Sequence, residues 1–120
     1  MSRHDPAVSL RQITELARQA QKICEGHTLD SFMTDWKGML ALERVMELIG
    51  ETVKRLPLDL RHRYPQPNWQ AITGMRDHLS HGKSVLMGNP IGILWNAVHQ
   101  NIPLLLATIE KILSDLKNPP

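Results

Sequence analysis

The chain has 120 residues, of which 42% are hydrophobic and 22% are charged, with a formal net charge of +2. This length and balance predict one water-soluble globular domain, residues 1–120. Cys24 is the only cysteine, which excludes an intramolecular disulfide and favours a reducing, cytoplasmic setting. The first ten residues lack the apolar stretch of a signal peptide, and the apolar runs elsewhere are too short to cross a bilayer. No membrane role is expected.

The first predicted helix covers residues 5–26. Asp5 followed by Pro6 is typical of an N-cap with proline at the first helical position, and Gly26 is typical of a C-terminal stop. Apolar residues recur along this segment at spacings of three and four. They are Ile13, Leu16, Ala17, Ala20, Ile23 and Cys24.

A second helix is predicted at residues 34–56, after a short turn at 27–35. Its apolar stripe consists of Met39, Leu42, Val45, Met46, Ile49, Val53 and Leu56. Pro57 and the segment YPQP predict a connecting loop over residues 57–67. Basic residues gather around this loop: Lys54, Arg55, Arg61, His62 and Arg63. Such a cluster can neutralise nucleic-acid phosphates, but by itself it favours a solvated connecting segment.

Two further helices are predicted in the second half of the chain. Asn68 caps the first of them, which ends near Gly82 and has the stripe Trp69, Ile72, Met75 and Leu79. A turn at 87–90 leads into the other, residues 90–116, with the stripe Ile91, Leu94, Trp95, Val98, Ile102, Leu105, Ile109, Ile112 and Leu116. Pro103 leaves the carbonyl of His99 without its usual partner and predicts a kink. Four antiparallel helices with short connections predict an all-α, up-and-down bundle.

Ionisable side chains are concentrated in residues 74–83, GMRDHLSHGK. Arg76 and His81 are five residues apart, so on a regular helix they diverge by about 140°. They can act on one substrate only if the helix unwinds near Gly82 or if two copies of the chain face each other. Asp77 and His81 are four residues apart and share a face, so the carboxylate can orient the imidazole.

Three interpretations of this segment remain open on the residues alone. The first is a solvated helix end, the default for an arbitrary sequence. The second is a metal site at His78 and His81, but zinc normally needs three or four ligands and no second pair is present, so no metal is predicted. The third is metal-free RNA cleavage, in which a histidine takes the 2′-hydroxyl proton and an arginine stabilises the charge that develops on phosphate.

The segment RDHLSH, Arg76 to His81, resembles the Arg-x4-6-His motif of the HEPN superfamily. The segments ALERVMELIGETVKRLP at 41–57, WQAITGMRDHLSHG at 69–82 and ILWNAVHQNIPLLLATIEKIL at 93–113 resemble its HepT-like branch. The similarity covers nearly the whole chain. It implies a four- to five-helix bundle that forms a homodimer, and a toxin of a type VII-like toxin–antitoxin pair whose antitoxin is a small nucleotidyltransferase.

The same resemblance implies a metal-independent RNA endonuclease that needs no cofactor. In that family the arginine and histidine meet in a cleft between two protomers. Carried over, Arg76 stabilises the transition state, His81 is the base, and Asp77 is the polar residue that commonly follows the arginine. Lys83 and His78 are further candidates for contacts to RNA phosphates.

The chain departs from the family at one position. Many HepT-like toxins continue the motif as His-x-Tyr, and the antitoxin silences them by transferring AMP to that tyrosine. Lys83 stands in its place, and the only tyrosine, Tyr64, lies in the preceding loop. Sequestration, modification of another residue and a lapsed toxin therefore all stay open. The alternative function is a catalytically inactive module that binds a nucleotidyltransferase partner or a nucleotide.

Overall fold

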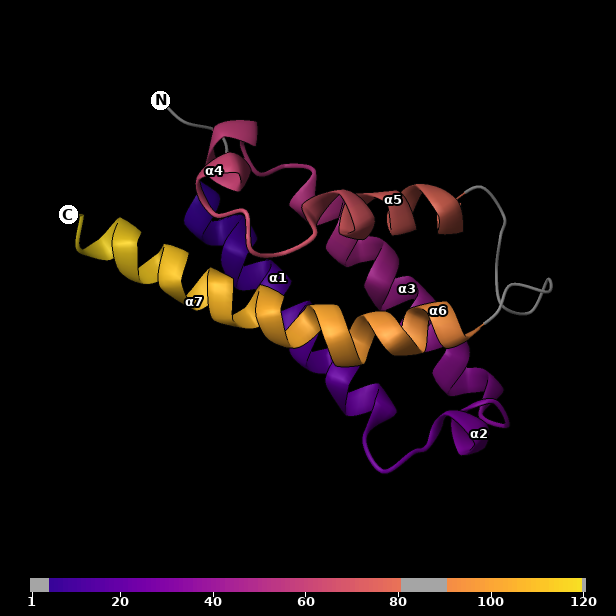
Figure 1. Cartoon of the computed structure of the whole chain (residues 1–120). Coiled ribbons are helices and arrows are strands. Elements are labelled where there is room, and N and C mark those ends of the chain that lie inside the picture. The colour runs from indigo at the N-terminus through magenta and orange to yellow at the C-terminus, as the bar shows by residue number, and fades with distance from the viewer. Residues whose placement is uncertain (1–4, 81–90, 120) are drawn as a thin grey trace.

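Helices make up most of the chain, and their arrangement confirms the predicted all-α bundle (Figure 1). The computed structural model describes residues 5–80 and 91–119, with residues 76–80 described by their backbone alone. The helices are α1 (Pro6–Cys24), α2 (Leu29–Phe32), α3 (Trp36–Val53), α4 (Leu58–Arg63), α5 (Trp69–Ser80), α6 (Ile91–Asn96) and α7 (Ile102–Lys117), with a π-helical segment η2 (Ala97–Asn101) between the last two. None of the described helices is long and apolar enough to cross a membrane.

Both predicted ends of the first helix are confirmed. The Asp5 carboxylate accepts a hydrogen bond of 3.0 Å from the backbone N–H of Ala7, and Pro6 occupies the first helical position. Gly26 follows the end of α1 with a φ of +80°, a left-handed conformation that a glycine adopts without a steric penalty. Local chemistry therefore sets the length of α1.

The core forms where α3 packs against both α1 and α5, and where α7 crosses α1. The predicted apolar stripes supply most of it. Its buried members include Leu10, Ile13, Ala17 and Ala20 from α1, Leu42, Met46, Ile49 and Val53 from α3, and Ile102, Leu105, Ile109 and Ile112 from α7. Leu116 is an exception to the predicted stripe, because it is 47% exposed near the end of α7.

Two short helices occupy segments that were predicted to be a turn and a loop. In α2, the Thr28 hydroxyl accepts from the backbone N–H of Ser31, and the Ser31 hydroxyl accepts in return from the N–H of Thr28. This capping box lets four residues form a helix that buries Phe32 completely. Similarly, α4 follows Pro57 and buries Leu60. Both helices are too short for apolar periodicity to reveal them.

A kink was predicted at Pro103, and the helix responds instead with the π-helical segment η2. The N–H of Ile102 donates to the carbonyl of Ala97, five residues earlier, instead of the usual four. A π-helical turn of this kind inserts one residue into the helical repeat just before the proline, which has no N–H to donate. Helices α6 and α7 nevertheless continue as one rod in Figure 1. The predicted turn at 87–90 and the predicted helix end near Gly82 lie outside the described residues.

Candidate functional site

Helix α5 carries the first half of the predicted catalytic motif. Its start is as predicted: the side-chain oxygen of Asn68 accepts a hydrogen bond of 3.0 Å from the N–H of Ala71, and Trp69 and Ile72 are buried. The backbone stays helical to Ser80, so Arg76, Asp77 and His78 lie on its last two turns. His81 and Lys83 lie outside the described residues. The structure thus places the arginine end of the motif on a helix that is anchored to α3.

A groove runs beside the motif-bearing part of α5. It has a volume of about 310 Å³ and is lined by Ala71 and Met75 of α5, Ile93 and Asn96 of α6, and Ala97, Gln100 and Asn101 of η2. Met75 directly precedes Arg76, and Ile93 is 53% exposed. The π-helical segment η2 therefore lies beside α5. The sequence did not predict this groove, because its residues come from segments about 20 residues apart in the chain.

Two histidines outside the motif, His27 and His99, take part in local structure. Nδ1 of His99 lies 2.7 Å from the carbonyl oxygen of Trp95, and the two rings are 4.4 Å apart between centroids. Nε2 of His27 lies 3.5 Å from a carboxylate oxygen of Asp35. Among residues 5–75 and 91–119, no three His, Cys, Asp or Glu side chains are grouped as a metal ion would require.

Tyr64 is held in place at both its hydroxyl and its backbone carbonyl. The hydroxyl donates a hydrogen bond of 2.6 Å to the Asp115 carboxylate of α7, and the indole N–H of Trp69 donates to the carbonyl of Tyr64 at 2.8 Å. The bond to Asp115 raises the pKa of the Tyr64 hydroxyl above its ordinary value. Tyr64 therefore ties the segment between α4 and α5 to α7.

The substitution Tyr64→Phe is expected to lower the denaturation midpoint at neutral pH, because it leaves Asp115 without its hydroxyl donor. Because the pKa of Tyr64 is higher in the folded protein than in the unfolded chain, the hydrogen bond stabilises the folded protein fully at pH values below the ordinary tyrosine pKa of 10.0. This stabilisation is lost as the pH rises through the folded-state pKa. The difference in midpoint between wild type and Tyr64→Phe should therefore stay constant from about pH 6 to pH 9 and shrink above about pH 10. Thermal unfolding followed by circular dichroism measures it. A difference that persists at alkaline pH would contradict this role.

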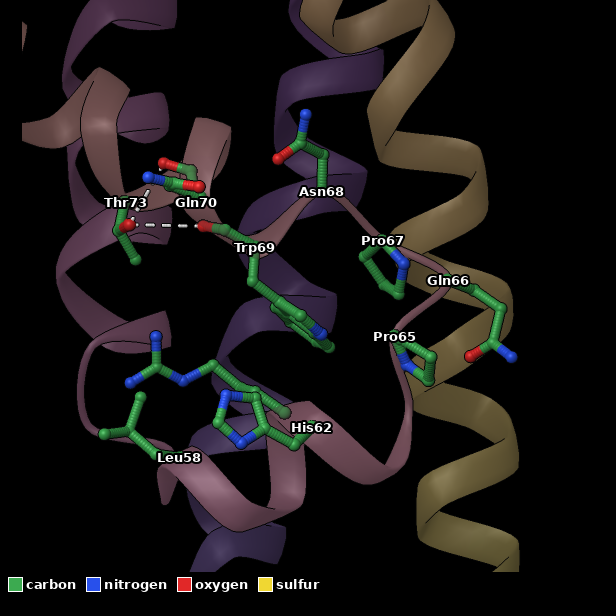
Figure 2. A pocket seen from close by; sticks show the side chains of 10 residues that line it. Leu58, His62, Pro65, Gln66, Pro67, Asn68, Trp69, Gln70 and Thr73 are labelled. Atoms are coloured by element: carbon green, nitrogen blue, oxygen red, sulfur yellow. Dashed lines mark hydrogen bonds between the residues drawn. The ribbon is translucent and has the colours of Figure 1, made fainter.

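A second and larger pocket lies between α4 and the start of α5 (Figure 2). We call it the α4–α5 pocket. It has a volume of about 770 Å³ and is lined by Leu58, Arg61 and His62 of α4, by residues 65–70, and by Thr73 of α5. Two members of the basic cluster, Arg61 and His62, thus line a concave site, where the sequence favoured a solvated connecting segment. The loop prediction for residues 57–67 did not reveal this site, because the pocket also needs residues from the start of α5 to close it.

Comparison with known proteins identifies the family. The family model described as ribonuclease HepT-like matches residues 13–112. A protein of Methanocaldococcus jannaschii whose name proposes an RNase is 32% identical over 117 residues, which cover 98% of this chain and 94% of that protein. A protein of Thermococcus cleftensis whose name proposes a ribonuclease HepT is 32% identical over 108 residues, or 90% of this chain and 89% of that protein.

A protein of Caldanaerobacter subterraneus whose name also proposes an RNase is 33% identical over 93 residues, which cover 78% of this chain and 80% of that protein. No solved structure matches the chain at a significant level. The family match and the near full-length similarity confirm both the predicted family and the predicted class of enzyme. The chain therefore belongs to the HepT-like ribonuclease family.

Proposed function

We propose that this protein is a metal-independent RNA endonuclease in which Arg76 and His81 carry out the chemistry. The family match to residues 13–112 carries the proposal, because the matched region includes both residues in the Arg-x4-His arrangement. His81 takes the proton of a 2′-hydroxyl, the 2′-oxygen attacks the adjacent phosphorus, and the bond to the 5′-oxygen breaks. The products are a 2′,3′-cyclic phosphate and a 5′-hydroxyl, whose oxygen takes up a proton as it leaves.

Each residue has a physical reason for its assigned part. The nucleophile is already part of the substrate, so no metal-bound water has to be generated. The guanidinium of Arg76 binds two phosphate oxygens at once and stabilises the extra charge of the five-coordinate transition state. Asp77 orients the imidazole of His81, and His78 and Lys83 contact neighbouring phosphates.

The active unit in this proposal is a homodimer with a shared cleft. The backbone of α5 is helical to Ser80, so Arg76 lies on a regular helical turn. On an ideal helix a residue five positions later points about 140° away. Two chains that face each other through α5 can bring the arginine of one to the histidine of the other.

As a toxin, the protein would be restrained by a nucleotidyltransferase antitoxin, and the restraint would not use a tyrosine. Lys83 stands at the position of the family's modified tyrosine. Tyr64, the only tyrosine, donates its hydroxyl to Asp115. These two observations favour restraint by binding of the partner or by modification of another residue.

The test is cleavage of a labelled tRNA and of a mixed RNA by the purified full-length protein in EDTA. We expect cleavage to continue in EDTA and to leave new 5′-hydroxyl ends, which a polynucleotide kinase labels directly. A DNA of the same sequence should stay intact, because it lacks the attacking hydroxyl. If the folded protein binds RNA or the nucleotidyltransferase but cleaves nothing, the alternative of a catalytically inactive binding module replaces this proposal.

A further inference from the structure

The α4–α5 pocket has the chemistry of a site for an anion that also carries an apolar surface. Arg61 and His62 supply its basic groups, and none of the described residues that line it is acidic. Trp69 and the two prolines of the loop supply apolar surface beside the amides of that loop. In Figure 2, His62 projects from α4 and Trp69 from α5 toward the space between the two helices. The volume of about 770 Å³ lies within the range of pockets that bind small organic ligands.

Arg61 has a donor that the described protein does not use. Its Nε atom is buried and has no hydrogen-bond partner among the described residues. Other arginines of the fold are paired: Arg44 with Glu47 at 2.8 Å and Arg55 with Glu51 at 3.9 Å. A buried N–H without an acceptor is costly, and a guanidinium binds phosphate oxygens more strongly than neutral acceptors. Arg61 therefore brings to the pocket a positive charge that no described lining residue neutralises.

The pocket ends close to the catalytic motif, because both lie on α5. Thr73 lines the pocket, and Arg76 follows it by three residues. Positions three apart in an α-helix are neighbours on one face, separated by about 4.5 Å along the axis. A strand whose scissile phosphate lies at Arg76 therefore has its neighbouring nucleotide within reach of the pocket.

We infer that the α4–α5 pocket binds a nucleotide of single-stranded RNA that flanks the cleaved bond. Its phosphate contacts Arg61, and its base packs against His62 and the apolar wall that includes Trp69. Proteins bind single-stranded nucleic acid in this way, by pairing a basic groove with flat side chains that stack on bases. The inference rests on the proposed ribonuclease function, and it assigns to α4 a role in substrate binding outside the catalytic motif.

Binding of an RNA that cannot be cleaved tests this assignment separately from catalysis. The probe is a fluorescent 2′-O-methyl RNA of about ten nucleotides, which lacks the attacking hydroxyl, and its anisotropy is measured with the full-length protein over a range of salt concentrations. Arg61→Met keeps the aliphatic stem and removes the charge. Arg63→Met is the matched control, because Arg63 is exposed on the same helix and does not line the pocket.

We expect Arg61→Met to weaken binding about ten-fold. It should also lower the slope of log affinity against log salt by about 0.7, the value for one phosphate contact on a single strand. Arg63→Met should change both quantities much less. Equal losses in the two variants would indicate general attraction by the basic cluster and would overturn the inference.

A second pair of variants covers the case in which Arg61→Met does not fold. Leu58 is 62% exposed at the pocket wall, and Leu58→Glu places a negative charge there without disturbing the core. Met33 is 54% exposed at the end of α2, remote from α4 in Figure 1, and Met33→Glu makes the same charge change. Leu58→Glu should weaken binding of the 2′-O-methyl RNA several-fold more than Met33→Glu does.

The outcomes separate this inference from the proposed function. Binding that depends on Arg61 and Leu58, in a wild-type protein that cleaves nothing, would support the pocket and overturn the ribonuclease proposal. If the wild-type protein cleaves RNA but its RNA binding is unchanged in both variants, the ribonuclease proposal is supported and the inference about the pocket is overturned. If both variants bind RNA normally but lose affinity for the nucleotidyltransferase partner, the pocket holds an acidic segment of that partner and the RNA assignment is wrong.

Discussion

The substitution His81→Ala is expected to lower the rate of RNA cleavage by about 10²- to 10⁴-fold, the usual contribution of one positioned acid–base group. The proposed mechanism assigns the 2′-hydroxyl proton to no other side chain, so the loss should not be compensated. Cleavage under single-turnover conditions in EDTA measures the chemical step without product release. Circular dichroism shows whether the variant keeps its helices. A folded His81→Ala protein that cleaves RNA at the wild-type rate would remove the histidine from the mechanism.

Arg76→Ala should cost about 10²- to 10³-fold, because it removes a donor from the charge that develops at phosphorus. The variant Arg76→Lys separates the effect of charge from the effect of the planar guanidinium. A lysine keeps the positive charge but loses the planar fork that binds two oxygens, so it should recover only part of the lost rate. Full recovery would mean that Arg76 acts through charge alone. Arg76→Ala and His81→Ala together also test whether the active site is shared between two chains.

A mixture of Arg76→Ala and His81→Ala proteins distinguishes a shared cleft from a site within one chain. If the arginine of one protomer works with the histidine of the other, a mixed dimer holds one intact site out of two. Random exchange should then restore about a quarter of the wild-type rate. If both residues of a site come from the same chain, or if the protein is a monomer by light scattering, the mixture stays as inactive as its components.

The substitution Phe32→Ala is expected to lower the free energy of unfolding by about 3–5 kcal/mol. Phe32 is fully buried, and its ring lies 5.4 Å from that of Trp95 between centroids. Removing the ring leaves a cavity between α2 and the α6–η2 rod that neighbouring side chains can only partly fill. Urea denaturation followed by circular dichroism gives the value, because the midpoint shifts while the slope stays unchanged.

Met33→Ala is the control for this measurement. Met33 is the next residue in the chain and is 54% exposed, so its loss should change the free energy of unfolding by no more than about 0.5 kcal/mol. The contrast between neighbours tests whether α2 is part of the core. If the two substitutions cost the same, the short helix contributes no packing of its own and is only a surface turn.

Periodicity predicted the long helices because their apolar residues repeat over many turns. Helix α1 has 19 residues and α3 has 18, which is enough for a stripe to stand out, and both helices bury most of the predicted positions. Helix α2 has four residues and α4 has six. A segment of one or two turns offers no repeat to recognise, so Phe32 and Leu60 looked like apolar residues in connecting segments.

The proposed catalytic motif was accessible from the sequence because Arg76, Asp77 and His81 are close together along the chain and resemble a family pattern. The α4–α5 pocket was not. Its basic wall comes from Arg61 and His62, and its opposite wall comes from the start of α5. These residues meet only because the chain folds back between the two helices, where the carbonyl of Tyr64 accepts the indole N–H of Trp69.

The sequence by itself therefore determined the class of the fold, its long helices and the family. Each of these depends on residues within a few turns of one another, where helix geometry relates spacing to position. The tertiary structure alone decided that Tyr64 is hydrogen-bonded to Asp115, which lies 51 residues away, and that Arg61 and His62 of the basic cluster line a pocket. Such contacts depend on how whole helices pack, because packing brings together side chains whose separation along the chain carries no periodic signal.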